Sequence, residues 1–182
     1  MQQTTTKAAA KTTGKTIEQV KSLTVTAMGI ALVYVFTWLI NIQVFPGQGG
    51  LVHLGNVPLF IFAILFGRKT GAIAGGIGMG LFDLTSGWTA WAPFTLVVVG
   101  IMGYTAGLIG EKRKGFFWYL LAMTATLPIK IAGYYAAEGV ITGNWMAPAM
   151  SIPGNLLQVG AAIVITAVVI VPLKRTVNKV IG

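Results

Sequence analysis

The chain has 182 residues, of which 55% are hydrophobic and 9% are charged, and its mean hydropathy is +0.78. A soluble domain carries about 25% charged residues, so this composition excludes an ordinary water-soluble globule. The formal net charge is +9, from 13 Lys and Arg against 4 Asp and Glu. In a soluble chain this excess would suggest nucleic-acid binding, but the cytoplasmic loops of membrane proteins also collect Lys and Arg.

Apolar segments with the length of membrane spans recur along the chain with short polar breaks between them. A helix needs about 20 apolar residues to cross a hydrocarbon core of about 30 Å. The segments are residues 22–40, 53–67, 70–87, 92–110, 116–136 and 149–173. The sequence therefore predicts an all-α membrane protein with six transmembrane helices.

The basic residues indicate the orientation of these helices. If six helices alternate in direction, nearly all of the bases fall on one side of the membrane, and the positive-inside rule places that side and both termini in the cytoplasm. The bases on that side are Lys7, Lys11, Lys15, Lys21, Arg68, Lys69, Lys112, Arg113, Lys114, Lys174, Arg175 and Lys179. The orientation of the helices thus accounts for the excess of basic residues, and nucleic-acid binding is not needed to explain it.

The segments outside the predicted spans are short. Residues 1–16 repeat Thr, Lys and Ala and predict a disordered cytoplasmic tail. This leaves residues 17–182 as a single six-helix transmembrane domain. On the outer side, Pro46 and Gly47 make the loop 41–52 irregular, so we interpret this loop as a candidate lid.

Catalytic and metal-binding motifs do not emerge from the sequence. Gly14-Lys15-Thr16 is similar to the end of a phosphate-binding loop, but Ala9 stands where that motif needs its first Gly. The chain has no Cys, and its lone His53 and scattered carboxylates form no hydrolytic or metal-ligand constellation. We therefore expect no enzyme activity, cofactor or metal in this chain, and any uphill transport would draw energy from an ion gradient or another polypeptide.

Small residues recur at helical spacing along several of the predicted spans. Between helices in a membrane, small side chains allow the backbones to approach closely. The residues are Gly67, Gly71 and Gly75 at the third span, Gly100, Gly103, Gly107 and Gly110 in the fourth, and Ala27 and Ala31 in the first. On composition alone, we interpret these stripes as packing faces.

Lys130 is the base that orientation does not explain. It lies fourteen positions into the fifth span, about 21 Å from its cytoplasmic end at 1.5 Å per residue, and Asp83 lies at a similar depth in the third. Charged groups at such depth are costly and face a cavity or one another. The alternatives to a ligand-binding role are that Lys130 snorkels to the outer interface or forms a structural ion pair with Asp83.

Other polar and aromatic side chains fall at the same level. Tyr134 and Glu138 follow Lys130 at i+4 and i+8, so the three share one helix face. This pattern predicts an outward-facing, aromatic-walled pocket for a small flat ring with hydroxyl or amine substituents. The predicted substrate-binding residues are Asn56, Asp83, Trp91, Lys130, Tyr134, Glu138, Asn155 and Gln158, with His53, Trp88 and Tyr135 nearby.

Residues 54–110 carry the most specific pattern. They contain Gly55-Asn56-Val57-Pro58, Phe66-Gly67-Arg68-Lys69-Thr70-Gly71, Gly78-Met79-Gly80-Leu81-Phe82-Asp83-Leu84, Trp91-Ala92-Pro93-Phe94-Thr95 and Gly100-Ile101-Met102-Gly103. Together with Ala27-x-x-x-Ala31 in the first span, this succession resembles the substrate-binding S components of energy-coupling factor (ECF) vitamin transporters. The similar group includes carriers of hydroxymethylpyrimidine, pyridoxine and riboflavin.

The resemblance implies an S-component-like bundle in the bacterial plasma membrane that captures a small water-soluble vitamin or precursor from outside. We expect hydroxymethylpyrimidine or pyridoxine to be favoured over riboflavin. The implied partners are a membrane coupling (T) subunit, contacted through Ala27 and Ala31, and two cytoplasmic ATPase subunits that use ATP. The alternative is an autonomous ion-coupled carrier of small solutes, in which Lys130, Asp83 and Glu138 form a proton relay.

Overall fold

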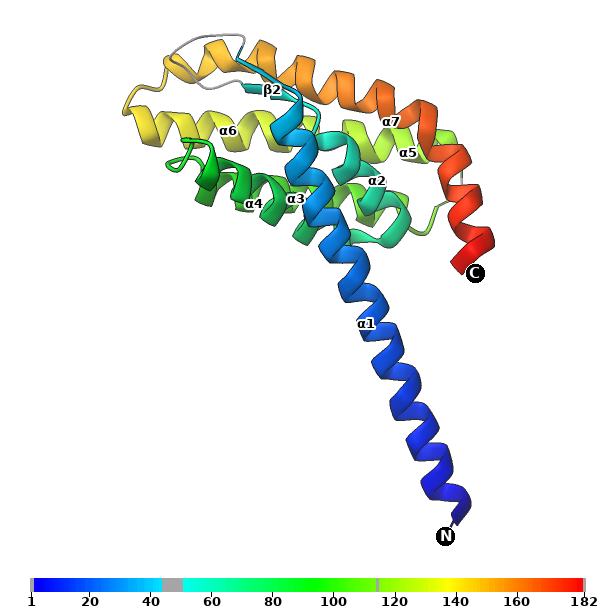
Figure 1. Cartoon of the computed structure of the whole chain (residues 1–182). Helices are drawn as coiled ribbons and strands as arrows, with labels where there is room; N and C mark the ends of the chain where they lie inside the picture. The colour runs from blue at the N-terminus through cyan, green and yellow to red at the C-terminus, as the bar shows by residue number, and fades with distance from the viewer. Residues whose placement is uncertain (1, 44–50, 114, 182) are drawn as a thin grey trace.

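The structure is a computed structural model that describes residues 2–43, 51–113 and 115–181. It is a helical bundle crossed by a long first helix (Figure 1), so the predicted helical architecture is confirmed. The elements are α1 (Gln2–Leu39), β1 (Asn41–Gln43), β2 (Leu51–His53), α2 (Asn56–Phe66), α3 (Arg68–Thr85), α4 (Ala92–Gly110), α5 (Phe116–Thr124), α6 (Leu127–Thr142), the 3-10 helix η1 (Ala147–Ser151) and α7 (Ile152–Ile181).

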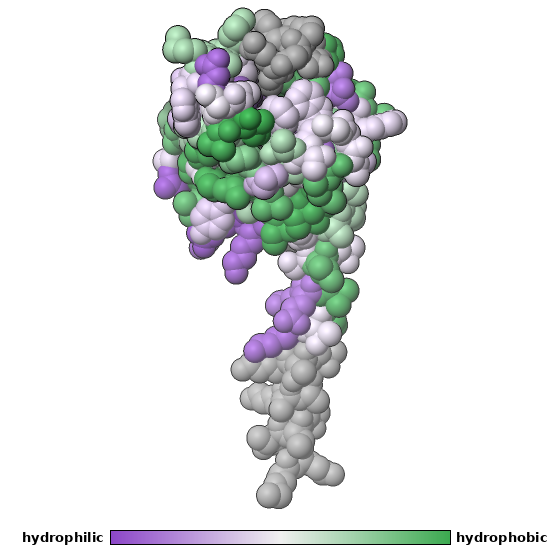
Figure 2. Space-filling model, turned by 90° about the vertical axis from the view of Figure 1, so that its left-hand side faces the viewer, coloured by the Kyte–Doolittle hydropathy of each residue, from purple (hydrophilic) through white to green (hydrophobic). Residues whose placement is uncertain are grey.

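Four helical segments among the described residues are long and apolar enough to cross a membrane. They are Gly14–Leu39, Ala92–Gly110, Phe116–Thr142 and Ala147–Val177. Figure 2 shows many hydrophobic side chains on the face of the bundle that is in view, as expected for a surface that faces lipid. A multi-pass membrane protein is therefore supported, while the number of six spans and the cytoplasmic position of the termini stay predictions.

The segment predicted as one helix over 116–136 is interrupted in the structure. α5 ends at Thr124 and α6 begins at Leu127. Pro128 explains the break, because it has no N–H to donate to the carbonyl of Thr124. Proline is tolerated in the first turn of a helix, and α6 accordingly begins beside it. The break places Lys130 in the first turn of α6, where its N–H donates to the carbonyl of Thr126 at 3.0 Å.

The predicted irregular loop 41–52 instead contains part of a β-hairpin. β1 and β2 pair antiparallel, with Asn41 opposite His53 and Ile42 opposite Val52. The β-branched pair Ile42 and Val52 suits a strand. Because side chains alternate along a strand, Leu51 and His53 share the opposite face of β2 from Val52. The Pro and Gly residues behind the candidate lid lie outside the described residues.

The predicted disordered tail, residues 1–16, is helical from Gln2 onward in the structure, where it forms the first part of α1. Its Ala, Lys and Gln residues have high helix propensity, which accounts for the difference. Figure 1 shows this part of α1 extending away from the bundle. The boundary of a single transmembrane domain at residue 17 stays a prediction.

The glycine stripes predicted as packing faces lie where helices meet, whereas Ala27 and Ala31, which were predicted to pack in the same way, are exposed on α1. A Cβ atom on Gly103 of α4 would collide with the backbone of Gly71 on α3, and one on Gly107 with the backbone of Arg68. A Cβ on Gly29 of α1 would come within 2.9 Å of Ala74 on α3. Glycine thus allows α3 to pack directly against both α4 and α1.

Basic segments that are far apart in sequence meet at one end of the bundle. Glu111, after α4, accepts the backbone N–H of Arg68 at 2.8 Å, and its Oε1 lies 3.8 Å from the Arg68 Nε. The Lys174 Nζ of α7 donates to the carbonyls of Ile64 at 3.5 Å and Gly110 at 3.4 Å. This convergence agrees with the predicted shared side for these bases.

Candidate ligand-binding site

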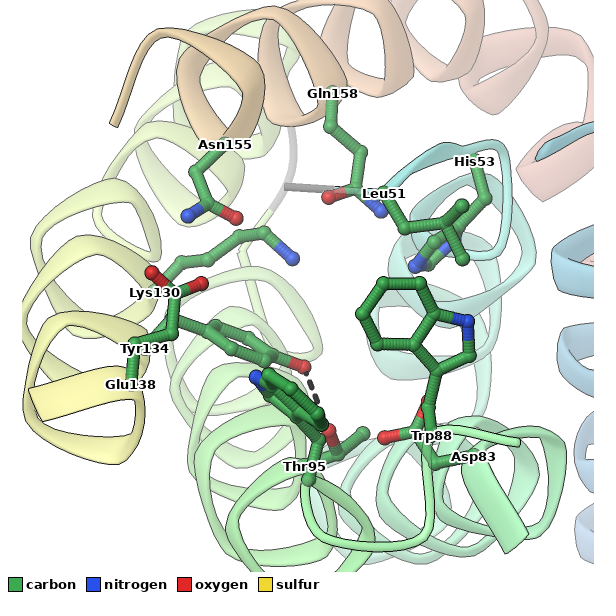
Figure 3. A pocket seen from close by; sticks show the side chains of 11 residues that line it. Leu51, His53, Asp83, Trp88, Thr95, Lys130, Tyr134, Glu138, Asn155 and Gln158 are labelled. Carbon is green, nitrogen blue, oxygen red and sulfur yellow. Dashed lines mark hydrogen bonds between the residues drawn. The ribbon is translucent and has the colours of Figure 1, made fainter. Parts of the chain in front are cut away.

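A pocket lies at the opposite end of α4 from Glu111, between β2, α3, α4, α6, α7 and the turn before α4 (Figure 3). The space inside it that is open to the centre of a water molecule is about 40 Å³. Its lining residues are Leu51, His53, Asp83, Trp88, Trp91, Thr95, Lys130, Tyr134, Glu138, Asn155 and Gln158.

The structure brings together every predicted substrate-binding residue except Asn56. Those that line the pocket are Asp83, Trp91, Lys130, Tyr134, Glu138, Asn155 and Gln158. Asn56 is absent from the lining and is 0% exposed at the start of α2, where its amide has no hydrogen-bond partner among the described residues. Its place in the predicted set rested on depth, which does not fix the side of the helix from which a residue projects.

The sequence-based set lacked four residues of the lining. The sequence places His53 and Trp88 near the set, but it does not predict Leu51 or Thr95. Thr95 follows Trp91 at i+4, a spacing that puts two residues on one side of a helix, and this signal was present in the sequence. Leu51 lines the pocket because it belongs to strand β2 of the hairpin, and the sequence predicts an irregular loop there.

Lys130 is buried, with 2% of its surface exposed, and its amino group points into the pocket (Figure 3). Its Nζ lies 4.6 Å from the centroid of the Tyr134 ring, a cation–π contact. Among the described residues it forms no ion pair with Asp83 or Glu138. The geometry therefore matches neither a side chain that snorkels to the surface nor a structural ion pair.

Aromatic residues form the walls around this amino group. The rings of Trp88 and Trp91 meet edge to face, with centroids 5.1 Å apart and an interplanar angle of 74°. The hydroxyl groups of Tyr134 and Thr95 are hydrogen-bonded at 3.0 Å, which fixes the Tyr134 ring beside Lys130. His53 accepts the N–H of Gly55 on Nδ1 at 3.2 Å, so the hydrogen of the neutral ring is on Nε2.

Several polar atoms of the lining are buried without a hydrogen-bond partner in the described part of the chain. They are Oδ2 of Asp83, Nε1 of Trp91 and Nε2 of Gln158. Buried polar groups are ordinarily hydrogen-bonded, and leaving one unpaired costs about 1–3 kcal/mol. The pocket therefore offers one acceptor and two donors that a polar ligand would satisfy.

Comparisons with known proteins agree with this architecture. A family model described as "ECF-type riboflavin transporter, S component" matches residues 17–175. A protein of Lactococcus lactis subsp. cremoris (strain MG1363), named "Thiamine precursor transporter HmpT", is 30% identical over 159 residues, which cover 87% of this chain and 91% of the relative.

Two further relatives have names that state no substrate. An "uncharacterized protein in gap 3'region" of Pyrococcus woesei is 32% identical over 111 residues, covering 61% of this chain and 74% of the relative. A "UPF0397 protein" of Lactococcus lactis subsp. cremoris (strain SK11) is 27% identical over 169 residues, covering 79% and 89%. The resemblance predicted from the sequence is confirmed by the family match, and this chain belongs to the family of S components of ECF-type riboflavin transporters.

Proposed function

We propose that this chain captures a small water-soluble vitamin or vitamin precursor from outside the cell, and that hydroxymethylpyrimidine or pyridoxine is favoured over riboflavin. The observation that carries the proposal is the buried amino group of Lys130, which faces an aromatic-walled pocket without an ion-pair partner among the described residues. Buried charges in membrane proteins ordinarily mark a functional site.

The chemistry of the lining suits a single substituted ring. Trp88 and Trp91 supply surfaces for stacking. The free carboxylate oxygen of Asp83 would accept a hydrogen bond from an amine or hydroxyl group, while Gln158 and Trp91 would donate to a ring nitrogen or hydroxyl oxygen. Hydroxymethylpyrimidine and pyridoxine both carry such groups.

Pocket size and one relative support a small ligand. Riboflavin, with three fused rings and a sugar-alcohol chain, would require a larger expansion of this pocket than either single-ring compound. One relative is named for transport of a thiamine precursor, and thiamine contains a substituted pyrimidine ring. These observations favour a pyrimidine or pyridine compound within a family named after riboflavin.

Isothermal titration of the purified full chain with hydroxymethylpyrimidine, pyridoxine and riboflavin tests the proposal. We expect saturable binding of one of the two single-ring compounds, and binding of riboflavin that is weaker by at least about tenfold, a difference of about 1.4 kcal/mol. Tight binding of riboflavin alone would overturn the proposed preference. If none of the three binds, the assignment of these compounds as substrates is contradicted.

We also propose that the chain works with a membrane coupling subunit and two cytoplasmic ATPases that supply ATP hydrolysis, with six spans and both termini inside. Family membership supports these partners. Ala27 and Ala31 are both exposed on α1, and small side chains would let a partner helix lie close to them. The basic segments that converge at one end of the bundle support the orientation.

A second candidate function is ion-coupled transport by this chain alone. The observation that favours it is the presence of three buried titratable side chains, Lys130, Asp83 and Glu138, around one pocket. Such groups form proton relays in some transporters. The two functions predict different behaviour of the chain when it is reconstituted without partners.

A further inference from the structure

A second cavity lies at the other end of α4 from the ligand pocket, between the α4–α5 connection and α7. The space in it that is open to the centre of a water molecule is about 610 Å³, far more than in the ligand pocket. Its walls carry four bases, Lys112 and Arg113 after α4 and Lys174 and Arg175 on α7. These bases come from two separate segments and converge on one space.

The charge of this basic cavity is poorly balanced by acids. Among the described residues that line it, Glu111 is the one carboxylate. Glu111 is already engaged by Arg68, through the backbone N–H at 2.8 Å and the Nε at 3.8 Å. Lys112 and Arg175 are exposed and form no ion pair with any described residue. The cavity therefore has a positive charge that an anion would neutralise.

Neighbouring contacts hold two of the bases in place. The Arg113 guanidinium lies 3.7 Å from the centroid of the Trp118 ring. The Lys174 Nζ lies 4.8 Å from the centroid of the Tyr119 ring and donates to two backbone carbonyls. Cation–π contacts leave guanidinium and ammonium hydrogens free to reach an anion. Part of the entropic cost of ordering long side chains around a ligand is thus already met.

One side of the basic cavity is apolar and continues onto the surface of α7. Phe116 and Val171 belong to its lining. Val164, Val168, Val171 and Arg175 follow one another at helical spacing, so they share a face of α7. Val164 is 65% exposed and Val168 is 74% exposed. A strip of exposed apolar side chains therefore leads from the bases along a helix of membrane-spanning length.

We propose that this basic cavity binds the phosphate headgroup of an anionic phospholipid, with the acyl chains along Val164 and Val168. Guanidinium and ammonium groups recognise phosphate by charge-assisted hydrogen bonds, and basic pockets between membrane helices on the cytoplasmic side suit anionic lipid headgroups. A soluble phosphate has the same chemistry as the headgroup, but it has no acyl chains that would contact the apolar strip. The positive-inside rule explains why basic residues lie on one side of the membrane, but it does not require them to line a cavity. It therefore does not account for this arrangement.

Native mass spectrometry of the full chain in neutral detergent, with phosphatidylglycerol and phosphatidylcholine in equal amounts, tests the proposal. We expect phosphatidylglycerol to be retained preferentially. The variant Lys112→Gln/Arg113→Gln/Arg175→Gln should lose this preference by at least about tenfold, because each base near a lipid surface contributes about fivefold in affinity. The control Lys15→Gln/Lys69→Gln/Lys179→Gln removes the same charge outside the cavity and should retain the preference.

Three results would overturn the proposal. Equal loss in both triple variants would indicate diffuse attraction to the net charge. Displacement of the lipid by soluble glycerol phosphate at the same concentration would indicate a site for free phosphate. If the triple variant does not fold, the single variants Lys112→Gln and Arg175→Gln, both at exposed positions, should each weaken retention about fivefold, and no change in either would contradict the site.

Discussion

Lys130 is the residue of the candidate ligand-binding site whose burial points most directly to a ligand. Its side chain is 2% exposed, and its amino group lies against the ring of Tyr134. A cation–π contact offsets only part of the solvation that a buried ammonium loses. A ligand with a ring nitrogen or hydroxyl oxygen would supply the missing acceptor. Ligand binding would therefore offset part of the solvation free energy that Lys130 loses on burial.

Replacing Lys130 by Met keeps an unbranched side chain of similar length and removes the hydrogen-bond donors of the amino group. We expect Lys130→Met to weaken binding of the preferred single-ring compound by about tenfold to a hundredfold, since a hydrogen bond to a charged group contributes about 1.5–3 kcal/mol. The control is Lys69→Met, at an exposed position beside the α2–α3 turn, which should bind normally. Equal affinities of the two variants in calorimetry would contradict the role of Lys130.

Much of the candidate site could be predicted at the level of single residues, because membrane depth can be counted along a helix. Lys130 and Asp83 were identified in this way, and both line the pocket. Depth does not determine which way a side chain points, and this is why Asn56 was included although it lies outside the lining. Leu51 reaches the pocket through a strand pairing that residue counting does not contain.

At the scale of elements, glycine faces determine how closely the helices pack. Gly71 of α3 and Gly103 of α4 approach so closely that a side chain on either would strike the other helix. The same two helices carry Asp83 and Thr95 to the pocket. Packing of α3 against α4 therefore sets the distance between two walls of the site.

The close approach of these helices predicts a stability difference between two glycine variants. Gly103→Val would force α3 and α4 apart, so we expect it to destabilise the protein by about 1–3 kcal/mol. Gly160→Ala, in α7, is the control because a Cβ there meets nothing within 4 Å, and it should leave the melting temperature unchanged or raise it. Thermal denaturation in detergent measures both. Equal melting temperatures for wild type and Gly103→Val would contradict this packing account.

α1 presents two faces with different roles. Gly29 and Val33 are buried against α2 and α3, whereas Ala27 and Ala31 are exposed. The exposed pair lies four residues apart, on one side of the helix. This division leaves a surface of small residues available to the proposed coupling subunit.

Bulky residues on this surface should separate the subunits without affecting the ligand pocket. We expect Ala27→Trp or Ala31→Trp to abolish co-purification with the coupling subunit while the affinity for the ligand stays at the wild-type value. Val97→Trp places the same side chain at another exposed position, on α4, and should still co-purify. Normal assembly of both alanine variants would disprove the proposed interface.

The predicted helices agree with the structure where an apolar segment begins and ends with the helix. They differ where a proline interrupts the helix or where a short strand forms. The predicted span 92–110 coincides with α4. The helix predicted over 116–136 is divided into α5 and α6 because Pro128 cannot donate a backbone hydrogen bond, although Phe116–Thr142 together remain long and apolar enough for one span. The short strands of the hairpin were missed because three residues give too little alternation to predict a strand.

At the scale of the whole molecule, the chain is a helical membrane bundle with two chemically different ends. One end holds the aromatic pocket with its buried amino group, and the other gathers the basic segments around Arg68, Glu111 and Lys174. Much of the net charge of +9 therefore lies at one end of the bundle. We interpret the chain as the specificity subunit of a larger importer, consistent with its family.

Reconstitution of this chain alone into liposomes tests that central claim most directly. With radiolabelled hydroxymethylpyrimidine and pyridoxine outside, and a proton or sodium gradient across the membrane, we predict saturable binding to the protein and no accumulation of label in the lumen. Addition of a coupling subunit and its ATPases with ATP should then start uptake. Accumulation driven by the ion gradient in liposomes that contain only this chain would contradict the account and support an autonomous carrier.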